Sequence, residues 1–501
     1  MTKTRTGAKG SLARVLVALV IGASAVVTAA SSFAPTGSMS TARYGHTSTL
    51  LLDGTVLVTG GDSAYSHAYL ASAEIYDPAT GLFTPTVGDM STPRYTHTAT
   101  RLPDGKVLVT GGKTGSGITN SAEIYDPGTG SFTPTTGNMS TPRWFVHTAT
   151  LLLNGTVLVA GGITDGSSGF TASAEIYDPG TGTFSPTGSL STRRHFHTAT
   201  RLVDGRVLVV GGNLTTNGTG PTASAEIYDP GAGIFSSAGS TSSPLWGHTA
   251  TLLATGNVLV TGGYSGSAWL DDAEVYDLGT GLFSPTSSMN TARYFHTATR
   301  LTDGTVLITG GKNSGTGFPA SAEIYDPNLG SFTTTASSMT SGRALHRATF
   351  LADGTVLITG GDGGSGFLAS AEIYGDADTD GDGVGNADDL CPDTPAGSTV
   401  NFTGCTFDQL QGPQGADGLN GATGGTGPPG APGATGAAGE AGPTGPTGPK
   451  GAAGTAGPTG STGGQGVQGV PGITGALGAT GAQGIQGNPG AAGADGAQGE
   501  G

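Results

Sequence analysis

The strongest constraint on the fold of this chain is an internal repeat of about fifty residues. A histidine recurs in the phrase "HTAT" or a close variant, with successive spacings of 48 to 51 residues, at His46, His97, His147, His197, His248, His296 and His346. A glycine pair and a Glu-(Ile/Val)-Tyr phrase keep the same period. Self-similarity of this kind indicates one supersecondary module per period, each module completing its core against its neighbours.

Each module is predicted to contain four strands and no helix. Residues 97–112, "HTATRLPDGKVLVTGG", give an apolar-alternating run, an Asp-Gly turn and a β-branched run that stops at the glycine pair, which is typical of a hairpin. The phrase "SAEIYDP" is the expected third strand and "SFTPT" the fourth. Four short strands per repeat are typical of a propeller blade. We therefore predict an all-β, seven-bladed propeller over residues 31–375.

The spacing of the glycines and aromatic residues resembles that of kelch repeats. A glycine pair closes one strand, a tyrosine lies on the next, and an aromatic residue follows seven positions later, as in Tyr76 and Phe83. Kelch repeats usually have Trp at the last position, where this chain has Phe. The replacement keeps an aromatic wedge between blades. The resemblance implies a kelch-type propeller.

The seventh module lacks its fourth strand at the end of the repeat array. The seventh module stops at "AEIYG", residues 371–375, whereas "SFAPTGSM" at residues 32–39 copies "SFTPTTGNM" at residues 131–139. We expect Phe33 to Thr36 to pair with the strand around Tyr374. That pairing would close the ring and remove two exposed sheet edges.

The first thirty residues indicate export. Basic residues precede an apolar run that ends in small residues near Ala29 and Ala30, as in a cleaved signal peptide over residues 1–30. An uncleaved anchor is the alternative. The net charge of −16 without a basic run argues against nucleic acid or an anionic membrane surface as partner. We predict a secreted or cell-surface protein with no membrane span after signal cleavage.

Residues 376–411 are predicted to form a calcium-binding hinge. Oxygen ligands at loop positions 1, 3, 5, 7, 9 and 12 would come from Asp378, Asp380, Asp382, Val384, Asn386 and Asp389. The segment resembles thrombospondin type 3 repeats, whose Asp-rich loops end in "CP". Only two cysteines occur, Cys391 and Cys405, and export makes a disulfide between them the default expectation. A solvated acidic linker is the alternative.

The tail over residues 412–501 follows the collagen rule. Glycine occupies every third position from Gly412 to Gly499, and (499 − 412)/3 gives 29 steps. Only glycine fits the axis of three wound chains, so the tail predicts a homotrimer. It resembles bacterial and phage collagen-like stalks. A disordered Gly-rich linker is the alternative, and stability without hydroxyproline stays open.

Functional residues are expected where the blades differ. An Arg, His or Glu present in nearly every blade is expected to be structural, with the Glu of "AEIY" as the partner of the repeated Arg. The loops that precede the first strand and follow the second open on one face in propellers. The ligand-binding candidates on that face are Trp144, Trp246, Trp269, Tyr264 and Tyr65, because aromatic rings stack on sugars or peptides. Packing between blades is the competing explanation.

These features predict a secreted binding or adhesion protein whose propeller head binds a carbohydrate or surface ligand on a trimeric stalk. An extracellular carbohydrate-active enzyme and a structural envelope or coat protein are the alternatives. Galactose oxidase and its relatives also have kelch-like blades, but they need a Tyr crosslinked to a Cys within the propeller, where this chain has no Cys. His195 and His197 are a weak metal candidate. The variable loops offer few carboxylates beyond Asp62, Asp165, Asp271, Asp272 and Asp362. We therefore expect no enzymatic activity, and calcium as the only cofactor.

Overall fold

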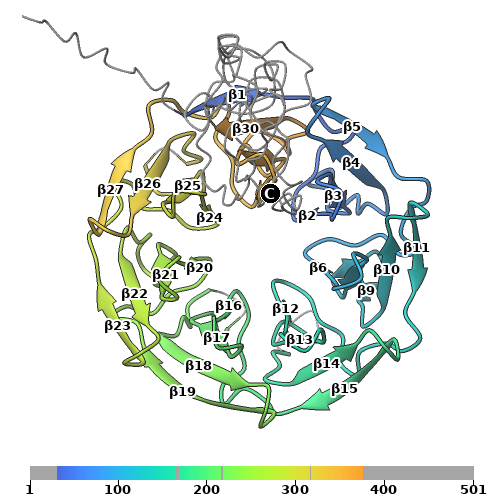
Figure 1. Ribbon diagram of the computed structural model, residues 1–501, viewed down its shortest axis with the longest axis horizontal. Coiled ribbons are helices and arrows are strands. Elements are labelled where there is room, and N and C mark those ends of the chain that lie inside the picture. The colour runs from blue at the N-terminus through green and yellow to red at the C-terminus, as the bar shows by residue number, and fades with distance from the viewer. Residues whose placement is uncertain (1–30, 165–168, 216–217, 316, 376–501) are drawn as a thin grey trace, which may run out of the picture.

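The computed structural model describes residues 31–164, 169–215, 218–315 and 317–375. These residues form seven four-stranded antiparallel sheets and one small hairpin, and no helix occurs among them. The sheets are arranged as blades around a common axis (Figure 1). The predicted seven-bladed propeller is confirmed. Within these ranges nothing helical is long and apolar enough to cross a bilayer.

The four strands of each blade run from the axis outward. The innermost strands are β2 (Thr47–Leu50), β6 (Thr98–Arg101), β12 (Thr148–Leu151), β16 (Thr198–Arg201), β20 (Thr249–Leu252), β24 (Thr297–Arg300) and β28 (Arg347–Phe350). The second strands are β3 (Val56–Thr59), β7 (Val107–Thr110), β13 (Val157–Ala160), β17 (Val207–Val210), β21 (Val258–Thr261), β25 (Val306–Thr309) and β29 (Val356–Thr359). We number the blades 1 to 7 in this order.

The third strands are β4 (Ala73–Asp77), β10 (Ala122–Asp126), β14 (Ala174–Asp178), β18 (Ser224–Asp229), β22 (Ala273–Asp277), β26 (Ala322–Asp326) and β30 (Ala371–Gly375). The outer strands are β5 (Leu82–Pro85), β11 (Ser131–Pro134), β15 (Thr183–Thr187), β19 (Ile234–Ser240), β23 (Leu282–Pro285), β27 (Ser331–Thr334) and β1 (Ser32–Pro35). The hairpin of β8 (Lys113–Thr114) and β9 (Gly117–Ile118) extends a loop of blade 2 and does not follow from the repeat pattern.

The outer strand of blade 7 comes from the other end of the chain. Strand β1 pairs antiparallel with β30, and Phe33 lies opposite Tyr374 with 4.7 Å between ring centroids. The innermost strands β28 and β2 also lie against each other. Blades 7 and 1 are therefore neighbours, as are all other consecutive blades (Figure 1).

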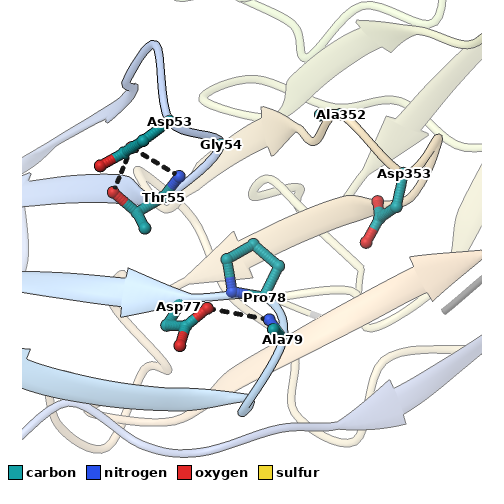
Figure 2. A pocket seen from close by; sticks show the side chains of 8 residues that line it. All are labelled: Asp53, Gly54, Thr55, Asp77, Pro78, Ala79, Ala352 and Asp353. Carbon is teal, nitrogen blue, oxygen red and sulfur yellow. Dashed lines mark hydrogen bonds between the residues drawn. The ribbon is translucent and has the colours of Figure 1, made fainter. Parts of the chain in front are cut away.

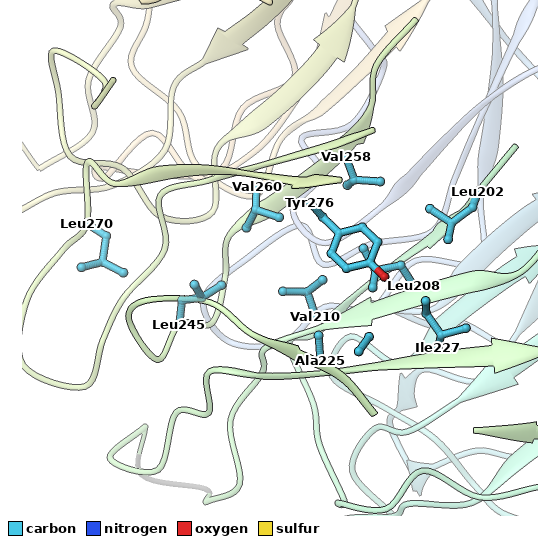
Figure 3. Packing of buried hydrophobic residues seen from close by; sticks show 11 residues of the cluster. Leu202, Leu208, Val210, Ala225, Ile227, Leu245, Val258, Val260, Leu270 and Tyr276 are labelled. Atoms are coloured by element: carbon cyan, nitrogen blue, oxygen red, sulfur yellow. The ribbon is translucent and has the colours of Figure 1, made fainter. Parts of the chain in front are cut away.

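The hydrophobic core lies between blades. Between blades 4 and 5, Leu208 and Val210 pack with Val258, Val260 and the ring of Tyr276 (Figure 3). The second strands are buried on both faces, which explains why their sequences are runs of Val and Leu instead of alternating apolar and polar residues. Each blade buries its apolar surface only against its neighbours, so the core depends on the complete ring.

A buried ion pair recurs in six blades. In blade 1, Arg43 is fully buried, its Nη2 lies 2.9 Å from Glu74 Oε1, and its Nη1 donates to the carbonyl oxygens of Gly60 and Ser72. The other pairs are Arg94–Glu123, Arg143–Glu175, Arg194–Glu226, Arg293–Glu323 and Arg343–Glu372, at 2.7 to 3.1 Å. The predicted structural role of the repeated Arg and Glu is confirmed. Each pair ties a loop to the glycine pair and the third strand.

The repeated histidines connect each blade to the preceding one. His97 Nε2 of blade 2 lies 3.1 Å from Thr47 Oγ1 and 3.0 Å from Thr59 Oγ1, both in blade 1. The same kind of hydrogen bond, at 2.9 to 3.3 Å, is made by all seven repeated histidines. Burial lowers the pKa of His147, His248 and His296 to about 3. These imidazoles are therefore neutral, and their role is structural.

Candidate functional site

Two sets of loops meet at one end of the propeller, which we call the loop face. In blade 5, Trp246 follows the position of the repeated Arg and forms a backbone bridge with Tyr264, which bridges in turn to Trp269. In blade 1, Tyr44 bridges to Asp62 in the same way. The loops before the first strand and after the second strand therefore lie side by side, as predicted.

The opposite end, which we call the turn face, carries the Asp-Gly turns and both ends of the described chain. Gly375, the last residue of β30, pairs with Ser32, the first residue of β1. On its other side, β30 pairs with β29: Tyr374 lies opposite Val356, and Val356 comes soon after the Asp-Gly turn of blade 7. The chain therefore leaves the propeller toward its predicted hinge from the end opposite the loop face.

Three of the five predicted ligand-binding residues lie together. Trp246, Tyr264 and Trp269 form a cluster with Tyr294 of blade 6, and their ring centroids are 5.2 to 6.4 Å apart. All four residues are half-buried, so the cluster is partly exposed to solvent. We call this group the tryptophan cluster. Tyr294 was not among the predicted residues, although it occupies the position after the repeated Arg.

The other two predicted residues lie elsewhere on the loop face. Trp144 packs on Phe145 at 4.6 Å, and the ammonium group of Lys113 lies 4.6 Å from the Trp144 ring centroid. Tyr65 is 60% exposed, and its hydroxyl donates to Asp362 Oδ1 across the junction of blades 1 and 7 at 2.8 Å. The five candidates are thus divided among three places.

The aromatic residues also pack between blades. Tyr44 contacts Tyr95 of the next blade at 6.4 Å, and Phe196 contacts Trp246 of the next at 4.8 Å. The indole Nε1 atoms of Trp246 and Trp269 are buried without an acceptor within the described residues. The rings therefore have a packing role in addition to any role in binding.

A ring of strained residues surrounds the axis at the loop face and was missed by the sequence reasoning. The residue directly before each repeated histidine has a positive φ, including Phe196 at 55°, Phe295 at 58° and Leu345 at 51°. L-residues rarely adopt this conformation. Backbone bonds support it, since Phe295 N donates to Gly247 O and Leu345 N to Phe295 O. The sequence did contain a signal for this conformation, because two blades have a glycine at this position, Gly45 and Gly247.

Comparison with known families agrees with this geometry. Residues 25–212 match the model of the KLHDC2/KLHL20/DRC7 Kelch-repeats domain, and residues 249–290 match the Kelch motif. The propeller is built of kelch repeats. Residues 446–501 match the collagen triple helix repeat. No curated protein matches the chain.

Among solved structures, the kelch propeller is similar to a novel fungal alcohol oxidase of the AA5 family in complex with copper. The identity is 21% and the TM-score is 0.56, with 70% of this chain and 77% of that chain covered. A likeness at this level concerns the fold alone.

The described residues do not fit a copper centre. Residues 31–375 contain no cysteine, and no three His, Cys, Asp or Glu side chains in the described part are placed to hold a metal ion. The His195 ring stacks on Phe170 at 4.9 Å, whereas His197 Nε2 bonds Thr148 Oγ1. Burial lowers the pKa of His195 to about 4. The weak metal candidate formed by these two histidines is therefore not supported.

A cavity on the turn face of the kelch propeller is lined by three carboxylates. Its volume is about 300 Å³, and Asp53, Asp77 and Asp353 surround it (Figure 2). Asp53 Oδ1 accepts from Thr55 N and Oγ1, and Asp77 Oδ1 accepts from Ala79 N. These carboxylates stabilise turns through local hydrogen bonds, and we assign no ligand to them.

The predicted hinge lies outside the described residues. This concerns the calcium ligands Asp378, Asp380, Asp382, Val384, Asn386 and Asp389, and the disulfide between Cys391 and Cys405. Both stay predictions.

Proposed function

We propose that this protein is a secreted binding protein whose kelch head binds a carbohydrate or surface ligand through the loop face, displayed on a trimeric collagen-like stalk. One observation carries the proposal: the aromatic loop face and the exit of the chain at Gly375 lie at opposite ends of the propeller. Because the stalk would be attached at the turn face, the loop face at the opposite end would be free to contact a ligand. Three weakly binding heads on one stalk gain avidity.

The tryptophan cluster is the proposed ligand site. Half-exposed indole and phenol rings offer the apolar surface on which a sugar ring stacks. Polar groups that fix orientation are nearby, because Asp271 lies two residues after Trp269 and is exposed, and Lys312 bridges to Tyr294. This cluster combines residues of blades 5 and 6, so it depends on one particular pair of neighbouring blades.

Substitution of Trp269 tests this site. In the full-length protein, we expect Trp269→Ala to weaken glycan-array or cell-surface binding about tenfold or more, because aromatic anchors dominate interfaces. Phe170→Ala is the matched control, since Phe170 occupies the same bridging position in blade 3 and lies outside the cluster. An equal loss in both variants, or no glycan or surface binding by the unaltered protein, contradicts the proposal.

The tail is proposed to be a triple helix. We expect a trimeric mass in solution and a cooperative circular-dichroism melt of the tail. Gly454→Ala should lower that melting temperature, whereas Ala452→Ser, at a position that does not face the helix axis, should have little effect. A monomeric mass without a cooperative transition contradicts trimerisation.

The same proposal includes a signal-directed export, calcium in the hinge over residues 376–411 and ring closure by β1. It includes no catalysis.

A further inference from the structure

One residue breaks the sequence pattern of the innermost strands. The position after the repeated histidine carries threonine in six blades, at Thr47, Thr98, Thr148, Thr198, Thr249 and Thr297. Blade 7 has Arg347 there. Each of the six threonine hydroxyls bonds the histidine of the next blade. Arg347 has no such hydroxyl, so His46 of blade 1 bonds only Thr359 Oγ1 of blade 7, at 2.9 Å.

Arg347 lies inside the ring of blades. Two adjoining cavities, of about 310 Å³ and about 240 Å³, are together lined by residues of all seven blades, which lie on the innermost strands or directly before them. We call them the central channel. Arg347, Val146 and Leu345 line both cavities, so Arg347 belongs to the wall that the two cavities share. Protein surrounds Arg347, yet part of its side chain stays accessible to water.

The charge of Arg347 has no counter-ion among the described residues. Its Nη1 donates to the carbonyl oxygen of His346 at 3.1 Å, and none of the ion pairs in the described ranges includes it. By contrast, the six fully buried arginines each have a glutamate partner. Burial lowers the pKa of Arg347 to about 10, which leaves it charged at neutral pH.

The surroundings of Arg347 do not neutralise it. The titratable groups that interact with Arg347 are Tyr44, His46, His97 and His346. Burial raises the pKa of Tyr44 to about 12 and lowers the pKa values of the three histidines well below the usual range, so all four groups are uncharged at neutral pH. Arg43 is already paired with Glu74. A largely buried cation is costly unless an anion accompanies it.

We propose that Arg347 makes the central channel a binding site for a carboxylate-bearing small molecule. The planar guanidinium fork matches a carboxylate and bonds it bidentately. The combined space of the two cavities suits a ligand of about monosaccharide size. This site lies on the propeller axis, separate from the tryptophan cluster, and it does not rest on the proposed adhesion function.

The natural test is Arg347→Thr in the full-length protein, because threonine restores the residue of the other six blades and the missing hydroxyl beside His46. We expect this variant to fold and to be at least as stable as the unaltered protein. Titration calorimetry would use D-glucuronate as a sugar acid, N-acetyl-L-aspartate as a peptide-like acid, and D-glucose as the neutral control. Arg347→Lys keeps the positive charge but loses the planar guanidinium group that donates two parallel hydrogen bonds.

Binding of either acid to the unaltered protein, with a loss of tenfold or more in Arg347→Thr and a smaller loss in Arg347→Lys, supports the proposal. The acid that binds identifies the source of the carboxylate. No binding of either acid, equal binding of D-glucose, or unchanged binding by Arg347→Thr overturns it. Inorganic phosphate binding in place of both acids overturns the assignment to a carboxylate.

Discussion

Lowering the pH from 7 to 5 is expected to remove much of the stability of the propeller. The seven repeated histidines are buried and neutral in the fold, whereas in the unfolded chain they titrate near pH 6.5. His195 behaves in the same way, with its pKa lowered to about 4. In this pH range the unfolded chain binds protons that the folded chain does not, so acid favours unfolding.

The sign and the size of this effect follow from the depressed pKa values. The stabilisation is complete above about pH 6.5 and is lost as the pH falls from there toward the folded-state values near 3. Each histidine that stays neutral costs about 2 kcal/mol between pH 7 and pH 5. The cost of three or four such groups already compares with the whole stability of a typical domain, about 5 to 15 kcal/mol.

Urea unfolding of the full-length protein, followed by tyrosine and tryptophan fluorescence from pH 8 to pH 5, measures this dependence. His97→Gln should lower the stability at pH 8 but reduce the slope below pH 6.5 by about one proton. His67→Gln is the control, because His67 is exposed on a loop. A free energy of unfolding that stays constant from pH 7 to pH 5 contradicts the prediction.

Deleting residues 32–36 is expected to destabilise the head by on the order of 5 kcal/mol. The deletion removes all four pairs between β1 and β30 and exposes the ring of Tyr374, which is 5% exposed in the closed ring. It also removes the contact between Phe33 and Tyr374 and the hydrogen bond between Thr36 Oγ1 and Tyr76 Oη. The third strand of blade 7 would become an exposed edge available to another chain.

Thermal unfolding and light scattering of the deletion variant would report both consequences. A variant that lacks only residues 1–31 is the matched control, because it keeps β1 and should behave as the unaltered head does. A synthetic peptide of residues 32–39 should restore stability to the deletion variant by occupying the empty edge. Unchanged unfolding and solubility after deletion would show that β1 does not hold the ring together.

Much of the blade could be predicted from the sequence because its determinants are local and recur in most or all of the seven blades. The Asp-Gly turn, the glycine pair and the Tyr-Phe spacing each specify structure within about fifty residues. Because they recur from module to module, a chance match to any one pattern is excluded. The pairing of the repeated Arg with the Glu of the same blade follows similarly. The identity of individual functional residues has no such support, since each occurs once.

The sequence by itself therefore determined the number of blades, the composition of each strand and the existence of a collagen-like tail. Only the tertiary structure decided that Trp246, Trp269 and Tyr294 form one cluster while Trp144 and Tyr65 lie elsewhere. It likewise placed Arg347, which has no counter-ion among the described residues, in the wall of the central channel with residues of all seven blades. The physical reason is that these neighbours come from different modules, and their proximity exists only once the ring of blades is closed.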